Sequence, residues 1–183
     1  MAYFKTVDVA AIAICGALWG VLNVLFAPTF FKATGMPFLC DLIGFAMLIL
    51  GAWWIRKPGF LTFVGSIATI INLTLGTGIQ FLGFLAASTF FDVALAAIGY
   101  YTVFKKPAYT AISMMTLALA SAALAGTLIG SFFMTGSTLA RWGGVASWAG
   151  LHMIGGAIGG FIGITLVFAL KKRRIAVYNE SLS

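Results

Sequence analysis

Residues 43–55 read IGFAMLILGAWWI and contain no charged side chain. The run is apolar on every face and lacks the alternation of apolar and polar positions that strands of a membrane barrel require, so it predicts a helix. Residues 114–129, MMTLALASAALAGTLI, show the same pattern. Because helices satisfy their own backbone in lipid, these two runs predict an all-α chain that crosses a membrane.

The composition of the whole chain supports this interpretation. Of the 183 residues, 62% are hydrophobic and 8% are charged, whereas about a quarter of the residues in a soluble domain are charged. Such a chain cannot cover a surface that faces water, which excludes a soluble enzyme, a nucleic-acid-binding module and a disordered tail. We expect one transmembrane domain over residues 1–183 in the cytoplasmic membrane of the cell.

Six apolar segments are predicted to span the membrane as helices. They lie at approximately residues 7–27, 39–55, 60–80, 83–104, 109–134 and 144–170. A helix needs about 20 residues to cross the apolar layer of a bilayer, so the chain has room for six spans with short connections. The first segment is long for the apolar region of a secretory signal, and no small-x-small cleavage site precedes a soluble domain. We therefore expect it to be retained.

Basic residues are distributed unequally between the two ends of the predicted bundle. Lys32 and Arg141 fall on one side. The two short hairpins and both termini, on the other side, carry Lys5, Arg56, Lys57, Lys105, Lys106, Lys171, Lys172, Arg173 and Arg174. Cytoplasmic loops are enriched in Lys and Arg, so this split predicts that both termini are cytoplasmic. The net charge of +7 is then a signal of orientation, and we expect no nucleic-acid partner.

The two basic hairpins are similar in sequence. Residues 55–58, IRKP, recur as residues 104–107, FKKP. In each hairpin a basic pair ends one helix, and Pro can open the next at its first turn. Either a two-helix repeat or the convergence of tight cytoplasmic turns explains this similarity.

No catalytic motif is present in the sequence. The chain has one His and four acidic residues, and it contains no HExxH, GxSxG or phosphate-binding Walker motif. Cys15 and Cys40 give no metal-binding pattern. We expect a protein without enzymatic activity, cofactor or metal site.

Small residues four positions apart mark two faces for close helix contact. Gly residues at 155, 159 and 163 and at 156 and 160 form two series on the last span, and packing inside the bundle is the favoured explanation for them. Ala13 and Ala17 form a shorter strip on the first span. For this strip, docking onto a separate subunit competes with internal packing.

Polar side chains within the spans gather mainly in the outer half of the predicted bundle. An ionisable residue inside the membrane costs about 2.5–3.5 kcal/mol on insertion scales, so we expect Asp92 to face a partner or a watery cavity. His152 is a candidate ligand contact or an interhelical hydrogen-bond donor. Asp41 is expected to be an exposed carboxylate at a helix start.

Aromatic side chains around a few convergent polar groups are typical of a small-molecule pocket. A pore would need polar groups at every depth, and a proton pump would need a relay of carboxylates. We therefore predict an outward pocket for a small, partly aromatic, water-soluble nutrient. Its predicted lining is Asn23, Asn72, Gln80, Asp92, Trp148 and His152.

Residues 44–59, GFAMLILGAWWIRKPG, carry a resemblance to a known family. With the helix that follows and Leu75-Gly76 at its end, they resemble the substrate-binding S components of energy-coupling factor (ECF) transporters, in particular the hydroxymethylpyrimidine/thiamine class. The turn at residues 55–59 is the most specific part. Members of that class can carry glutamates along the third helix, where this chain has Gly65 and Asn72, which argues against a thiamine-like cation as the ligand.

The resemblance implies a passive binding protein without ATPase activity of its own. It implies association with a membrane scaffold subunit and two cytoplasmic ATPases, and Ala13 and Ala17 match the docking feature of the family. The ligand class that it suggests is a pyrimidine or a vitamin precursor.

A different class of function fits some of the same features. The glycine strips and the scarcity of ionisable groups are also expected of a small structural subunit of a larger membrane complex, with no ligand of its own. The clustering of polar and aromatic residues in the outer half favours the binding function. A small transporter working alone is disfavoured because the inner half has no polar path.

The predicted topology can be tested by labelling single cysteines. In a background without Cys15 and Cys40, cysteines placed at Lys32 and at Lys105 should react with an impermeant reagent from opposite sides of the membrane, because the two positions flank the membrane in the predicted topology. Reaction of both positions from the same side would contradict it.

Overall fold

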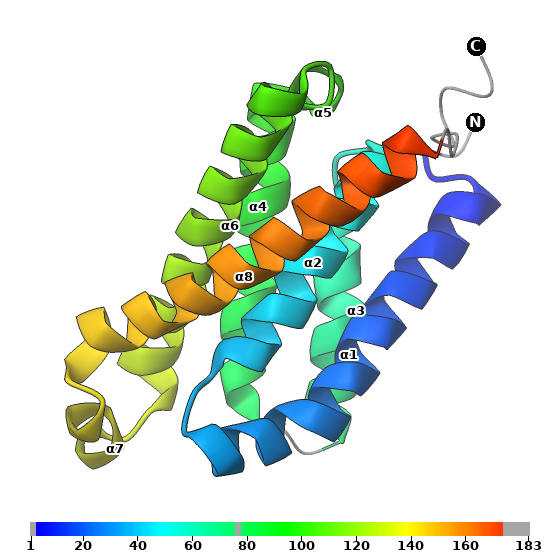
Figure 1. Cartoon of the computed structure of the whole chain (residues 1–183). Coiled ribbons are helices and arrows are strands. Elements are labelled where there is room, and N and C mark those ends of the chain that lie inside the picture. The colour runs from blue at the N-terminus through cyan, green and yellow to red at the C-terminus, as the bar shows by residue number, and fades with distance from the viewer. Residues whose placement is uncertain (1–2, 76–77, 174–183) are drawn as a thin grey trace.

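The computed structural model describes residues 3–75 and 78–173, and the fold is a bundle of helices (Figure 1). Its long helices are α1 (Thr6–Thr34), α2 (Phe38–Ile55), α3 (Phe60–Thr74), α4 (Leu82–Ile98), α6 (Pro107–Leu128) and α8 (Gly144–Lys172). Shorter elements connect them, namely the 3₁₀ turn η1 (Ile79–Phe81), α5 (Tyr100–Val103), the π-helical η2 (Ile129–Phe133) and α7 (Gly136–Arg141). The described residues contain no strand, so the predicted all-α class is confirmed.

Within residues 3–75 and 78–173, five helical segments are long and apolar enough to cross a membrane, which indicates a multi-pass membrane protein. They are Thr6–Thr34, Phe38–Ile55, Ile79–Ile98, Pro107–Phe133 and Gly144–Lys172. The remaining apolar helix, α3, has 15 residues and is shorter than the roughly 20 residues that a span normally needs. Six spans with cytoplasmic termini therefore stay a prediction.

Three of the predicted helix boundaries are wrong. The predicted span 60–80 is too long, because α3 ends at Thr74 and Gln80 belongs to η1. The span 83–104 is divided at Gly99, whose φ of +98° is a conformation that Gly adopts without a steric penalty. The first helix is longer than the predicted 7–27, since it continues through Pro28 to Thr34.

Helix α8 packs closely on both α2 and α6 through two separate rows of glycine. A Cβ atom added at Gly159 would lie 2.7 Å from the carbonyl oxygen of Leu42 in α2. One added at Gly156 would lie 2.6 Å from the Cβ of Ala122 in α6. Neither space admits a side chain, so each glycine row of the last span serves one internal helix contact.

Helix α1 uses a different pair of glycines and leaves its alanine strip outside the bundle. Cβ atoms at Gly16 and Gly20 would lie 2.7 and 2.9 Å from the Cβ atoms of Ile67 and Ile71 of α3. Ala13 is exposed, and Ala17 is half-buried. In Figure 1, α1 runs along one side of the bundle next to α3. Internal packing of α1 therefore depends on the glycines, and the alanines remain open to contact from outside.

The two ends of the bundle differ in composition. The start of α1, the end of α8, α5 and the α2–α3 turn lie at one end, and α7 and the last turns of α1 lie at the other (Figure 1). The first end carries the basic residues at 56–57, 105–106 and 171–173. This grouping of charges agrees with the sequence-based expectation, and the side of the membrane that each end faces stays a prediction.

The glycine contact between α8 and α2 can be tested with a matched pair of variants. We expect Gly159→Ala to lower the free energy of unfolding by about 1–3 kcal/mol, because the added methyl group overpacks against α2 backbone. Gly150→Ala lies on the same helix, where an added Cβ meets nothing within 4 Å, and the better helix propensity of Ala should leave stability equal or raise it by up to about 1 kcal/mol. Thermal unfolding in detergent measures both, and equal stability of the two variants would contradict the packing argument.

Candidate functional site

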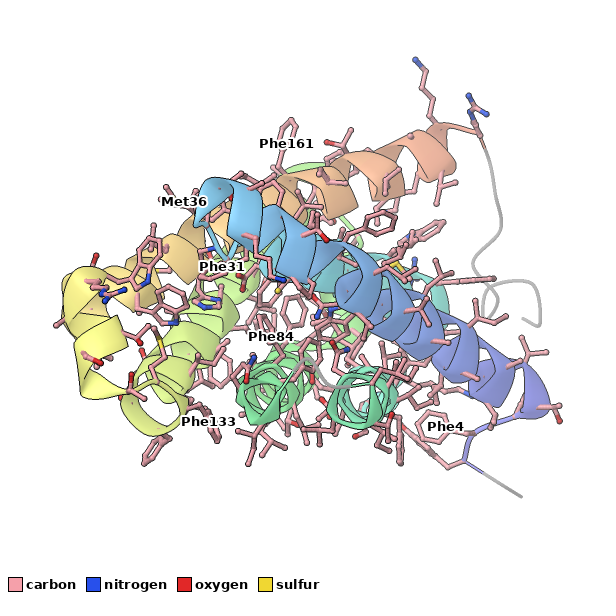
Figure 2. The ribbon with its side chains drawn as sticks, turned by 90° about the horizontal axis from the view of Figure 1, so that it is seen from below. Phe4, Phe31, Met36, Phe84, Phe133 and Phe161 are labelled. Atoms are coloured by element: carbon pink, nitrogen blue, oxygen red, sulfur yellow. The ribbon has the colours of Figure 1, made fainter. Side chains whose placement is uncertain are left out.

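A cavity of about 490 Å³ lies at the end of the bundle that carries α7 and the last turns of α1. Ligand pockets have volumes of roughly 300–1,000 Å³, so this one suits a small molecule. In Figure 2, which views the molecule from below, Phe31 of α1, Phe84 of α4 and Phe133 of η2 lie around this end. Side chains from these elements, from α2, α7 and α8 and from the turns between them line it: Asn23, Ala27, Pro28, Phe31, Lys32, Met36, Pro37, Leu39, Cys40, Gln80, Phe81, Phe84, Ile129, Phe133, Met134, Thr135, Thr138, Trp148 and His152.

Aromatic rings form much of the wall of the cavity. The ring centroid of Trp148 lies 6.5 Å from that of Phe31 and 5.4 Å from that of His152. The ring centroid of Phe84 lies 5.0 Å from that of Phe81 and 5.7 Å from that of His152, and the rings are tilted in both pairs. Such a wall buries the faces of a planar ligand in apolar surface, while ring edges offer a favourable partner to its π-system.

Three buried polar atoms on cavity-lining side chains have neither a hydrogen-bond partner nor an ion-pair contact among the described residues. They are Oδ1 of Asn23, Nε1 of Trp148 and Nε2 of His152. The three side chains are only 2%, 5% and 2% exposed, respectively. A buried polar atom without a partner costs about 1–3 kcal/mol, so the arrangement is one that a ligand with matching donors and acceptors would stabilise.

Asn23 owes its orientation to a second asparagine. Its amide nitrogen donates to Oδ1 of Asn72 at 2.7 Å, and the amide nitrogen of Asn72 donates to the carbonyl oxygen of Ala68 at 2.8 Å. These bonds leave Oδ1 of Asn23 as the free acceptor. Asn72 itself is fully buried and lies behind the cavity wall, so its role there is to orient Asn23.

His152 is held by a buried carboxylate. Its Nδ1 lies 2.8 Å from Oδ2 of Asp41, which belongs to the first turn of α2. Asp41 is completely buried, so the expectation of an exposed carboxylate at this helix start is wrong. The reason is the close approach of α8, where a Cβ added at Gly155 would lie 2.8 Å from the Cβ of Asp41.

Asp92, which the sequence places among the predicted lining residues, does not line this cavity, and its contacts lie at the start of α3. Its carboxylate accepts hydrogen bonds from the backbone N–H groups of Gly59 and Thr62 at 3.1 and 2.8 Å, from the Thr62 hydroxyl at 2.9 Å and from the Tyr100 hydroxyl. A carboxylate at a helix N-terminus is favoured by the helix dipole, so Asp92 caps α3. Burial and then the charge of Asp92 raise the pKa of Tyr100, which keeps its hydroxyl protonated as a donor.

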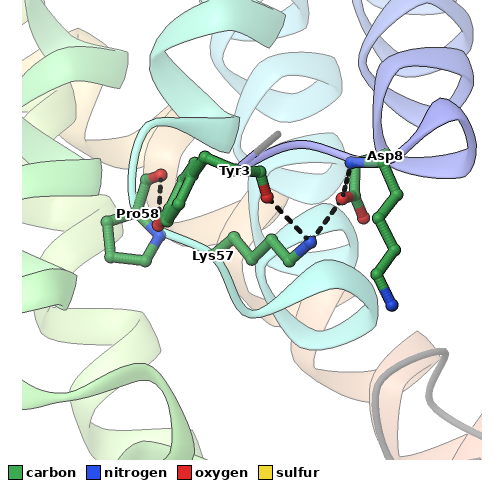
Figure 3. A network of polar contacts seen from close by, with 5 residues as sticks. Tyr3, Asp8, Lys57 and Pro58 are labelled. Carbon is green, nitrogen blue, oxygen red and sulfur yellow. Dashed lines mark hydrogen bonds and ion pairs between the residues drawn. The ribbon is translucent and has the colours of Figure 1, made fainter. Parts of the chain in front are cut away.

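The turn between α2 and α3 is also tied to the N-terminal segment (Figure 3). The ammonium group of Lys57 donates to the buried carboxylate of Asp8 and, at 3.3 Å, to the carbonyl oxygen of Tyr3. The Tyr3 hydroxyl donates to the carbonyl oxygen of Pro58 at 3.2 Å. Together with the Asp92 cap, these contacts make the turn a structural junction at the end of the bundle away from the cavity.

Four of the six residues predicted for the site therefore lie together. Asn23, Gln80, Trp148 and His152 line one cavity, Asn72 supports it from behind, and Asp92 lies elsewhere. Sequence reasoning missed the apolar lining from the end of α1, the pair Phe81 and Phe84, and the hydroxyl groups of Thr135 and Thr138. An i, i+3 spacing of two phenylalanines signals a shared helix face, but it does not say what that face contacts.

The charge of the cavity wall is limited to one cation. Lys32 lines the cavity, and no Asp or Glu is among the described lining residues. Within the described residues, no three His, Cys, Asp or Glu side chains lie together as a metal site requires. The wall thus suits a neutral or anionic organic molecule better than a cation.

Comparison with known proteins identifies a similar fold. The chain is similar to a solved structure described as the crystal structure of an S-component of ECF transporter, with a TM-score of 0.64 and 17% sequence identity. The similarity covers 94% of this chain and 88% of that chain. No family model matches the sequence, and no curated protein matches it significantly. The comparison establishes a shared fold, and it agrees with the family resemblance of residues 44–59.

The position of Asp92 yields a test of its role. We expect Asp92→Asn to lower the free energy of unfolding by about 1–3 kcal/mol, because an amide has one acceptor oxygen in place of the two carboxylate oxygens that cap α3. Ligand affinity should stay unchanged, since the residue is absent from the cavity wall. Thermal unfolding and ligand binding measured on the same protein distinguish a capping role from a binding role. Weaker binding at normal stability would show that Asp92 contributes to the binding site.

Proposed function

We propose that the chain is the membrane-embedded substrate-binding component of an ECF-type importer in the cytoplasmic membrane. The observation that carries this proposal is the set of three buried, unpartnered polar atoms on the wall of an aromatic cavity. A protein that only holds other helices gains nothing from such atoms, whereas a binding protein uses them to recognise its ligand. The similarity in fold to an S component gives independent support.

The proposed ligand is a small, planar nitrogen heterocycle, such as a pyrimidine related to the precursor half of thiamine. Trp148, Phe81 and Phe84 offer flat apolar surface for a ring. Asn23 offers an acceptor for an amino group, and the Trp148 indole offers a donor for a ring nitrogen. Thiamine itself fits less well, because no carboxylate among the described lining residues would balance its charge.

The proposed partners are a transmembrane scaffold subunit and the cytoplasmic ATPases that drive import. The alanine strip supports this part of the proposal, because Ala13 is exposed on the face of α1 that α3 leaves open. Small side chains on an exposed face let a second helix approach closely. The residues of α1 that line the cavity begin at Asn23, whereas the alanine strip lies earlier in the same helix and does not line the cavity, so binding and docking can be tested separately.

The role of the cavity can be tested with hydroxymethylpyrimidine and two tryptophan variants. Trp148→Phe removes an indole N–H that has no partner among the described residues, so stability should be unchanged while affinity falls roughly fivefold, the equivalent of about 1 kcal/mol for one hydrogen bond. Trp53→Phe is the matched control, because Trp53 is equally buried, its Nε1 is also unpartnered among those residues, and it lies outside the cavity.

Ligand-induced thermal stabilisation of the purified protein measures both affinities. Native mass spectrometry of protein purified gently from its own host adds a direct search for a bound small molecule and for copurifying ATPases. Equal affinities in the two variants, with no bound molecule and no ATPase, would contradict the proposal and favour a structural subunit.

The docking strip can be tested without the ligand. We expect Ala13→Leu or Ala17→Leu to weaken assembly with the scaffold subunit severalfold, because a bulky side chain separates two closely packed helices. Ala97→Leu, on an exposed position of α4, is the control and should assemble normally. Copurification of the scaffold subunit is the measurement, and normal assembly of all three variants would refute the docking role.

A further inference from the structure

We propose that Asp41 is a positioning residue that keeps Nε2 of His152 protonated, so that the cavity presents a second hydrogen-bond donor and selects ligands rich in acceptors. This inference deepens the proposed function and rests on it where the ligand is concerned. The protonation of His152 is a property of the protein alone.

The geometry of the pair fixes the orientation of the imidazole. Nδ1 of His152 lies 2.8 Å from Oδ2 of Asp41, and both side chains are at most 3% exposed. The ring is held further by neighbours, because its centroid lies 5.4 Å from that of Trp148 and 5.7 Å from that of Phe84. With Nδ1 committed to Asp41, Nε2 is the ring nitrogen that remains for a molecule in the cavity.

The number of protons held by the Asp41–His152 pair decides whether Nε2 is protonated. A buried pair with one net negative charge is costly, so the pair favours zero net charge. A neutral pair shares one proton between Oδ2 of Asp41 and Nδ1 of His152, and whichever atom holds that proton, the second imidazole hydrogen is on Nε2.

The surroundings contain few groups that could supply a compensating charge. Helix α4 contributes Phe84 to the imidazole, and α6 contributes Gly126, where an added Cβ would lie 2.9 Å from Cδ2 of His152. Besides His152, the titratable or charged groups among the described cavity-lining residues are Lys32 of α1 and Cys40 of α2. Lys32 is exposed, so water screens its charge and leaves the shared proton as the main means of neutralising Asp41.

The buried polar atoms without a partner among the described residues, together with Lys32, define the class of ligand. Nε2 of His152 and Nε1 of Trp148 are donors, Oδ1 of Asn23 is the acceptor, and Lys32 adds a positive charge. A matching ligand is a planar heterocycle with at least two acceptors, such as ring nitrogens or carbonyl oxygens, and one donor. It is neutral or carries an anionic substituent, and an organic cation of the same size is rejected.

The protonation of His152 can be read directly, because it is the single histidine of the chain. Protein labelled with ¹⁵N-histidine and placed in lipid nanodiscs should give one imidazole, whose Nε2 resonance is of the protonated type at neutral pH. Asp41→Asn removes the carboxylate that shares this proton, so a neutral ring should exchange between its two tautomers. An unprotonated Nε2 in the unsubstituted protein would overturn the inference.

A second measurement separates positioning from a purely structural role. We expect Asp41→Asn to weaken binding of hydroxymethylpyrimidine roughly tenfold with little change in thermal stability, whereas a structural residue would lower stability and spare affinity. Thiamine, the cationic probe, should bind the unsubstituted protein more weakly than hydroxymethylpyrimidine, and tighter binding of thiamine would overturn the selectivity. Failure of both probes to bind would contradict the proposed function. The histidine spectrum requires no ligand, so it would still test whether Nε2 of His152 is protonated.

Discussion

The distance between α8 and α2 is the constraint on which the rest of the molecule depends. Gly155 and Gly159 bring the two backbones together, and the pairing of Asp41 with His152 exists only at that separation. The second glycine row draws α6 onto the opposite flank of α8. In a membrane, where the apolar effect gives no drive for helices to associate, such close backbone contact is the main source of cohesion. The same glycines of α8 thus determine both the helix packing and the position of the polar pair beside the cavity.

The class of fold and the contact faces could be predicted because they depend on local pattern. Uninterrupted apolar runs specify helices, and glycines four apart specify close contacts whatever the partner. The ends of helices were predicted less well. Gly99 breaks the fourth segment, and Pro28 does not end the first. A helix in lipid tolerates Pro where neighbouring groups satisfy the backbone, and this depends on the tertiary structure.

The candidate site was predicted in part for a related reason. Polar residues in apolar spans are few, so Asn23, Trp148 and His152 stand out in the sequence. Their partners do not, because partners are distant along the chain. Asp92 and Asp41 look equally unusual, yet one binds the N-terminus of α3 and the other binds His152. Only the arrangement of helices decides which carboxylate caps a helix and which one pairs with a histidine.

The unequal lengths of the helices have a consequence for the surrounding lipid. Helices α1 and α8 have 29 residues each and α3 has 15, which at 1.5 Å per residue corresponds to about 43 Å and about 22 Å. A bilayer has an apolar thickness of about 30 Å, so the predicted topology of six spans requires the long helices to tilt and the lipids beside α3 to thin or let water enter. The bundle therefore deforms the membrane asymmetrically around its own circumference. The length of the lipid acyl chains should therefore affect this protein. Thinner bilayers relieve the strain beside α3 and increase the tilt that α1 and α8 require.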